Sequence, residues 1–322
     1  MIGRKKIAVS FHNFWGSFDA ETSYFTRALR DRFDVKIVRT GADVEFYSVF
    51  GRNFPDDVLS SRALKVWFSC EAEDPRDLIY DLYFNFHDEP LLGGRAVRLP
   101  LWALYIDWWT PGSVLSIERL LAPRHYTPRP KFCNFIYSNP VALRNEFFSR
   151  LDRLQHVDSF GKVLNNMGFR AGDKLKTIAD YRFTIAFENV KSYGYVTEKL
   201  LEPLAAGSTP IYWGPPDSRT DFNPAAFIDA TAFPSLDALA AHVIELDRNP
   251  DALRTIAEAP IFADAIPYEM TPSHVVDRIE EALDTPAMRG HGDLLNPQLA
   301  SRRNLKGRLR AGFAKALRKL SV

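Results

Sequence analysis

The residues with the clearest chemical potential lie between positions 188 and 199, where polar side chains follow an apolar run. This segment contains a flexible glycine, Gly194, and a lysine, Lys199, at the start of a stretch (196–206) whose apolar spacing is that of a helix. Backbone amides at a helix N-terminus and a nearby ammonium group attract phosphate oxygens. The segment therefore predicts a diphosphate site, with the charge met by Lys199 and at least one arginine.

Several common motifs for binding phosphate or its metal ion are absent from the sequence. It contains neither G-x-G-x-x-G nor G-x-x-x-x-G-K-[ST], which argues against a dinucleotide-binding fingerprint and a P-loop NTPase. No D-x-D triplet occurs either, so the sequence has no obvious pair of aspartates to coordinate a divalent cation. A purely structural helix, with Glu198 and Lys199 as a solvated ion pair, is the alternative interpretation.

The elements that must position these residues alternate between strand and helix along the chain. Apolar runs predict strands at 6–11, 35–40, 64–69, 81–86, 132–137, 185–187, 210–213 and 227–229, and helical spacing predicts helices at 23–33, 139–154, 196–206 and 235–248. This alternation is typical of parallel sheets, which bind ligands outside the carboxyl ends of their strands. With 322 residues, 46% of them hydrophobic, the chain is long enough for two such domains.

A segment rich in proline and basic residues, 122–131, marks the boundary between the two halves. We therefore expect an N-terminal domain at 1–125, a second domain at 126–290 and a basic amphipathic tail at 291–322. The predicted fold class is α/β, with two Rossmann-like doubly wound domains that face one another and a C-terminal amphipathic helix.

The end of the sequence differs in charge from the rest. Residues 302–322 contain no acid and eight basic residues, namely Arg302, Arg303, Lys306, Arg308, Arg310, Lys315, Arg318 and Lys319. Apolar residues recur every three or four positions beneath this cationic face, as in helices that lie on anionic membranes. We expect contact with an anionic membrane surface, and a solvated or core-docked helix is the alternative. A nucleic-acid partner is disfavoured because the remainder of the chain is acidic.

Cysteine usage and hydropathy bear on localisation. Cys70 and Cys133 are the only cysteines and cannot form a disulfide framework, which favours a reducing compartment. No signal peptide is visible, and no apolar stretch reaches transmembrane length. We expect a cytoplasmic protein that associates peripherally with the inner face of the membrane, and its oligomeric state is left open.

Taken together, the motifs resemble glycosyltransferase family 10, the α-1,3/4-fucosyltransferases, in its bacterial form. The signature of that family is matched by Phe-Glu-Asn at 187–189, Tyr-Val-Thr-Glu-Lys at 195–199 and Ile-Tyr-Trp-Gly at 211–214. The segment 132–140, with Arg144 and Asn145 after it, is similar to the first strand and helix of the family's donor domain. Further landmarks occur in the family's order at 6–9, 14–16, 49–51, 71–73, 87–89 and 98–101. The resemblance covers roughly residues 5–285.

This resemblance implies the GT-B fold, in which the C-terminal domain binds GDP-fucose and the N-terminal domain takes the acceptor sugar. It also implies inversion, from β-linked GDP-fucose to an α-fucoside. By matching positions, Arg144 and Lys199 face the diphosphate and Glu198 contacts the ribose hydroxyls of the nucleotide. Further donor contacts are implied for Ser138, Asn139, Asn189, Gly194 and Tyr195.

The resemblance identifies Glu89 as the general base that takes the proton of the acceptor hydroxyl. Asp88 and His87 are competing bases. Glu71 and Glu73 either hold acceptor hydroxyls or cap the loop after a strand.

Aromatic residues after the first strand are a second group of acceptor-binding candidates. Trp15 and His12 either form a platform on which a sugar stacks or belong to the core. Two positions depart from the family pattern, since Cys70 and Ala72 stand where many members have glycine and asparagine. Pro203 is expected to bend the second half of the signature helix.

The expected activity is inverting α-1,3 transfer of L-fucose from GDP-fucose to the N-acetylglucosamine of an N-acetyllactosamine-type glycan, as in lipopolysaccharide or a Lewis antigen. No cofactor and no essential metal are expected. A related GT-B enzyme that uses another nucleotide sugar, and a catalytically silent glycan- or membrane-binding module, are the alternatives. The choice between α-1,3 and α-1,4 linkage is left open.

Overall fold

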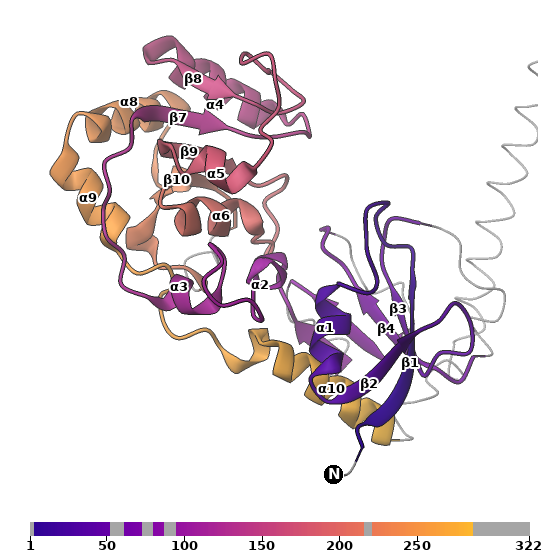
Figure 1. Ribbon diagram of the computed structural model, residues 1–322. Helices are drawn as coiled ribbons and strands as arrows, with labels where there is room; N and C mark the ends of the chain where they lie inside the picture. Colours follow the sequence, from indigo (N-terminus) through magenta and orange to yellow (C-terminus); the bar gives the residue numbers. More distant parts are fainter. Residues whose placement is uncertain (1–2, 52–60, 73–79, 87–94, 216–220, 286–322) are drawn as a thin grey trace, which may run out of the picture. The chain divides into compact units, whose positions relative to one another are not determined.

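The computed structural model describes residues 3–51, 61–72, 80–86, 95–215 and 221–285. The chain divides into two compact units. The first contains the described residues up to Val97, apart from Cys70–Ala72, together with the segment that begins at Ser273; the second contains Cys70–Ala72 and Arg98–Pro272. Figure 1 shows that a sheet with flanking helices makes up each unit.

The sheet of the first unit has six strands in the order β2-β1-β3-β4-β5-β6. Their bounds are β1 Lys5–His12, β2 Phe33–Ile37, β3 Val44–Tyr47, β4 Leu64–Phe68, β5 Leu82–Asn85 and β6 Ala96–Arg98. The pairings from β2 across to β5 are all parallel. Every residue of β3, β4 and β5 is buried, as expected for the central strands of a parallel sheet.

Two helices belong to this first sheet. Helix α1 (Tyr24–Arg30) begins at Ser23, whose hydroxyl accepts a hydrogen bond from the backbone N–H of Thr26. Helix α10 (Pro272–Asp284) comes from the far end of the described chain and is tied to the unit by ion pairs, Lys5 with Asp284 at 2.9 Å and Arg32 with Glu280 at 2.7 Å. The unit is therefore completed by residues that are remote in sequence.

The second unit contains a five-stranded parallel sheet in the order β11-β10-β9-β7-β8. Its strands are β7 Lys131–Phe135, β8 Val157–Ser159, β9 Tyr181–Phe187, β10 Thr209–Trp213 and β11 Ile228–Asp229. Its helices are α2 Leu101–Tyr105, α3 Ile117–Leu121, α4 Ala142–Leu154, α5 Lys174–Ile178, α6 Glu198–Ala206, α8 Leu236–Asp247 and α9 Pro250–Glu258, with short 3₁₀ turns at Pro224–Ala226, Ala230–Ala232 and Tyr268–Met270.

Alternate residues of β9 face opposite sides of this sheet. Phe183, Ile185 and Phe187 join one hydrophobic cluster with α4 and α8, which pack on each other. Helices α5 and α6 contact each other and β9 (Figure 1). Thr184, between the cluster residues, shares a hydrogen bond of 2.8 Å with Ser208 just after α6. This bond connects the middle of β9 to the segment between α6 and β10.

The prediction of two doubly wound α/β domains with parallel sheets is confirmed. Strand β2 was expected at 35–40 but begins at Phe33, because the buried Phe33 pairs with Lys5 at the start of β1. Strand β3 was not predicted, because the charged Glu45 interrupts its apolar residues. The segment 98–125 groups with the second unit.

Two expectations concern the helices. Helix α6 runs through Pro203 as a single helix from Glu198 to Ala206. The basic residues 302–322 lie outside the described residues, so the amphipathic tail stays a prediction. Within the described ranges, no helix combines the length and apolar character needed to cross a membrane.

Candidate functional site

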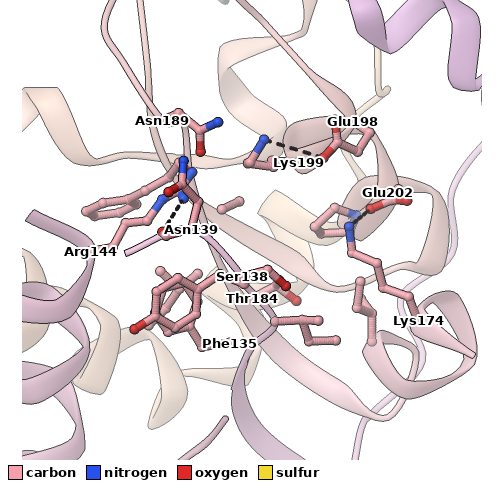
Figure 2. Close-up of a pocket in the computed structure, with 17 residues that line it drawn as sticks. Phe135, Ser138, Asn139, Arg144, Lys174, Thr184, Asn189, Glu198, Lys199 and Glu202 are labelled. Atoms are coloured by element: carbon pink, nitrogen blue, oxygen red, sulfur yellow. Dashed lines mark hydrogen bonds and ion pairs between the residues drawn. The ribbon is translucent and has the colours of Figure 1, made fainter. Parts of the chain in front are cut away.

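A cavity of about 360 Å³ lies in the second unit at the carboxyl ends of β7 and β9. Helices α4, α5 and α6 supply further lining residues, among them Arg144, Lys174 and Lys199 (Figure 2). The carboxyl ends of parallel strands are where α/β sheets bind ligands. The polar residues that line the cavity are Tyr137, Ser138, Asn139, Arg144, Lys174, Thr184, Asn189, Glu198, Lys199 and Glu202.

The start of α6 is fixed by the buried carboxylate of Glu188. This group accepts hydrogen bonds from the backbone N–H of Thr197 at 2.8 Å, from the Thr197 hydroxyl at 2.9 Å and from the Tyr212 hydroxyl at 3.3 Å. Burial raises the pKa of Glu188, and the neighbouring Lys199 opposes this shift. Thr197 in turn accepts a hydrogen bond from the backbone N–H of Lys199 and so caps the helix.

Lys199 is the ammonium group at this helix start. Its Nζ donates to the Thr197 hydroxyl at 3.0 Å and lies 3.4 Å from a carboxylate oxygen of Glu198 and 3.4 Å from one of Glu188. Burial lowers the pKa of Lys199, but the two carboxylates outweigh burial and the net shift is upward. The side chain, 23% exposed, therefore presents a fixed positive charge to the cavity.

Arg144 is a second cation of the wall, and it is almost completely buried. From α4, its Nε donates to the backbone carbonyl of Phe187 at 2.9 Å, and Nη2 donates to the same oxygen. Its Nη1 donates to the carbonyl of Asn139 at 3.4 Å. Burial lowers the pKa of Arg144, while Glu188 opposes this. The guanidinium thus joins the ends of β7 and β9, and three of its five N–H donors are accounted for by these bonds.

Glu198 is the carboxylate nearest to Lys199 along the helix. Burial raises its pKa, but the charges of Lys199 and Lys174 outweigh burial, and the net shift is downward. An ionised carboxylate in a cavity wall accepts hydrogen bonds strongly, and vicinal hydroxyls are suitable donors.

Six of the residues predicted to bind the donor are brought together around this cavity, namely Ser138, Asn139, Arg144, Asn189, Glu198 and Lys199. Gly194 and Tyr195 lie in the same unit but do not line it. Gly194 has a positive φ of 74°, and Tyr195 is buried, which raises the pKa of its phenol.

Only some of the predicted acceptor-binding residues belong to the described part of the chain. His12 ends β1, where its Nε2 lies 2.9 Å from the Ser10 hydroxyl and its ring stacks on Tyr47. Trp15 packs edge-on against Phe50, with ring centroids 5.8 Å apart. Both rings are half-buried, as is Glu71. The remaining candidates, Glu73, His87, Asp88 and Glu89, lie outside the described residues.

Two charged lining residues were missed by sequence reasoning. Lys174 begins α5, and Glu202 lies one helical turn after Glu198 on α6. The spacing of four residues between Glu198 and Glu202 was a usable signal, because it places both carboxylates on one helix face. In the part of the chain that the structure describes, no group of three or more His, Cys, Asp or Glu side chains could hold a metal ion.

Comparisons with known proteins agree with this geometry. Residues 127–256 match the model of the C-terminal part of glycosyltransferase family 10 (fucosyltransferase), and residues 9–105 match the N-terminal domain of α-(1,3)-fucosyltransferase FucT. The α-(1,3)-fucosyltransferase FucT of Helicobacter pylori is 28% identical over 294 residues, which cover 80% of this chain and 60% of that protein. The α-(1,3)-fucosyltransferase 4 of Bos taurus is 38% identical over 116 residues, or 34% of this chain and 29% of that one.

Solved structures show the same fold. The crystal structure of an α1,3-fucosyltransferase with GDP-fucose superposes with a TM-score of 0.71 at 22% identity, covering 88% of this chain and 92% of that one. This similarity confirms the expected GT-B fold class. The chain spans about 60% of the length of the Helicobacter pylori protein. Because the two matching models together span well over half of its residues, the chain belongs to glycosyltransferase family 10, the fucosyltransferases.

Proposed function

We propose that the chain is an inverting α-1,3-fucosyltransferase that moves L-fucose from GDP-fucose to the N-acetylglucosamine of an N-acetyllactosamine-type glycan. The observation that carries this proposal is the grouping of Lys199, Arg144 and Asn189 around one cavity at the start of α6. The family relatives named α-(1,3)-fucosyltransferase support the reaction and the donor.

In this proposal the diphosphate lies at the N-terminus of α6. The helix start contributes the positive end of its dipole, Lys199 supplies a compact charge, and the guanidinium of Arg144 supplies N–H donors beyond those engaged by Phe187 and Asn139. The carboxylate of Glu198 accepts from the ribose hydroxyls. Lys199 and Arg144 stabilise the negative charge that develops on the leaving GDP, so the reaction needs no essential metal.

The chemical step is a single displacement at the anomeric carbon. The acceptor oxygen forms a bond to this carbon while the bond to the β-phosphate oxygen breaks, and the electron pair leaves with GDP. The acceptor oxygen attacks from the face opposite the leaving group, which inverts the configuration, and its proton passes to Glu89. Asp88 and His87 are the competing bases.

The acceptor is proposed to bind the first unit near the carboxyl ends of β1 and β3. Trp15 and the 45% exposed Phe50 form an aromatic edge there on which a sugar ring can stack. His12, Glu71 and Glu73 are the proposed partners of acceptor hydroxyls. The basic residues 302–322 are proposed to hold the protein at an anionic membrane surface, close to lipid-linked glycans.

The test is GDP release from GDP-fucose, with and without N-acetyllactosamine, in the presence of EDTA. The proposal is supported if GDP release depends on the acceptor and persists in EDTA. Release should also fall in Glu89→Ala but not in Glu118→Ala, the control at an exposed glutamate. Parallel reactions with GDP-mannose and UDP-sugars address the alternative donors. Turnover of one of these in place of GDP-fucose contradicts the proposed donor, and an active Glu89→Ala removes Glu89 as the base.

A further inference from the structure

An ion pair of a half-buried lysine and a buried glutamate lines the donor cavity at a distance from the proposed diphosphate position. Lys174 of α5 pairs with Glu202 of α6, and the Glu202 side chain is only 9% exposed. Figure 2 shows this pair on the side of the cavity opposite Arg144, Asn139 and Asn189. Neither residue has a part in the diphosphate or ribose contacts described above.

A purely structural role does not explain this placement well. Bringing the Glu202 carboxylate out of water costs several kcal/mol, and an apolar side chain in the same place is often at least as stable. The α5–α6 contact could therefore be made by apolar residues. Instead, a carboxylate and an ammonium group stand in the wall of a cavity, beside the apolar side chains of Ile178 and Pro203.

The direction of a bound nucleotide follows from the other residues of the cavity. With the diphosphate at Lys199 and Arg144, and the ribose at Glu198, the nucleobase extends away from the start of α6. Glu198 and Glu202 lie one turn apart on the same helix face, about 6 Å along the axis. This step brings the base to Lys174 and Glu202.

The pair matches the edge of guanine and not those of the other common bases. Guanine presents two adjacent donors, N1–H and the N2 amino group, which suit the two oxygens of one carboxylate, and its neighbouring O6 accepts from an ammonium group. Uracil presents one N–H between two carbonyls, and adenine presents an acceptor at N1 that a carboxylate repels.

We propose that Glu202, oriented by Lys174, binds N1–H and the N2 amino group of guanine and so selects GDP-linked donors. This inference rests on the proposed function, because it takes the cavity to be the nucleotide site. Burial raises the pKa of Glu202 and the charge of Lys174 opposes this shift. Lys174 therefore favours the ionised form of Glu202, which is the form that accepts both hydrogen bonds.

The test compares the affinities of GDP, inosine diphosphate and xanthosine diphosphate by isothermal titration calorimetry on the full chain. Inosine lacks the N2 amino group, and xanthosine carries a carbonyl in its place. The wild type should bind GDP about 10-fold or more tightly than inosine diphosphate, the effect of one hydrogen bond to a charged group. In Glu202→Gln, the affinity for GDP should fall by a similar factor, and GDP should bind no more than about 3-fold more tightly than inosine diphosphate. Xanthosine diphosphate should bind Glu202→Gln more tightly than it binds the wild type.

Glu245→Gln, at an exposed glutamate of α8, is the matched control and should keep all three affinities. A gain in xanthosine diphosphate binding cannot result from misfolding. If Glu202→Gln does not fold, the wild-type affinities still test the inference, because equal affinities of the wild type for GDP and inosine diphosphate overturn it. A Glu202→Gln variant with the wild-type preference also overturns it and leaves the proposed function intact. Wild-type binding of UDP as tight as that of GDP contradicts the proposed function itself.

Discussion

The buried carboxylate of Glu188 accepts hydrogen bonds from both the backbone N–H of Thr197, at 2.8 Å, and its hydroxyl, at 2.9 Å. Glu188 follows β9 directly, and Thr197 is the N-cap of α6. The strand end and the helix start are therefore joined before any ligand arrives. Lys199, which donates to Thr197, is positioned by the same contact.

This relationship predicts a large loss of stability on removal of the carboxylate. Glu188→Ala leaves the Thr197 donors and the Lys199 charge without their buried partner, and should lower the free energy of unfolding by about 3–5 kcal/mol. Glu188→Gln should cost less, because the amide oxygen keeps one acceptor. Urea denaturation measures both variants, with the partly exposed Glu146→Ala on α4 as a control expected to change stability by about 0.5 kcal/mol or less. A Glu188→Ala protein as stable as the control contradicts the role given to this residue.

Gly207 ends α6 with a positive φ of 77°. A Cβ at this position would lie 2.2 Å from Nη2 of Arg129, whose Nε donates to the Gly207 carbonyl at 2.8 Å. Gly207→Ala should therefore lose about 1 kcal/mol for its backbone conformation and a further amount for displacing Arg129. Gly168→Ala isolates the first part, because Gly168 has the same φ and nothing within 4 Å of its Cβ position. Thermal unfolding of the two variants is the measurement, and equal losses would contradict the packing role of Arg129.

Cys70 precedes the acceptor candidate Glu71 in the sequence. Burial, followed by the charge of Glu71, raises the pKa of the Cys70 thiol to about 12. Because the folded pKa lies above the ordinary value near 8.5, the thiol remains protonated in the folded protein until the pH is well above 9. Cys133 is fully buried, and burial raises its pKa as well. Iodoacetamide near pH 8 should therefore label neither cysteine in the native protein and both in urea, as read by mass spectrometry. Rapid native labelling would contradict the burial of these thiols.

The pKa of Lys199 predicts how GDP binding responds to pH. Burial lowers this pKa, but Glu188 and Glu198 raise it further, so the folded value exceeds the ordinary value of 10.5. The ammonium charge is fully present below the ordinary value and is lost only as the pH rises through the folded value. The ratio of GDP affinities of wild type and Lys199→Met should therefore stay constant from about pH 8 to about pH 9.5. A ratio that collapses in this range would indicate a depressed pKa.

The diphosphate segment was predictable from sequence because its signals are local. The apolar run at 185–187 and the helical spacing of 196–206 depend on residues close together in the sequence, and the structure forms β9 and α6 there. The pair Lys174–Glu202 was not predictable in this way. The pairing of Lys174 with Glu202, and the burial of Glu202, arise from packing between α5 and α6, which cannot be read from the order of residues in the sequence.

Arg144 illustrates the same limit. The family resemblance placed it at the donor site, and it lines the cavity. That its guanidinium also binds the carbonyls of Phe187 and Asn139 depends on how close α4 comes to the ends of β7 and β9. Such distances follow from the assembled sheet. The domain boundary, the base Glu89 and the roles of the individual site residues stay predictions.

The central claim is that the cavity at the start of α6 holds the diphosphate of GDP-fucose. The most direct test is calorimetric titration of GDP into the wild type, Lys199→Met and Lys176→Met, the last at a lysine of α5 that is 86% exposed and outside the cavity. We expect Lys199→Met to bind GDP about 10- to 100-fold more weakly than the wild type, because it loses a charge-assisted contact to phosphate, and Lys176→Met to bind as the wild type does. Wild-type affinity in Lys199→Met would contradict the claim.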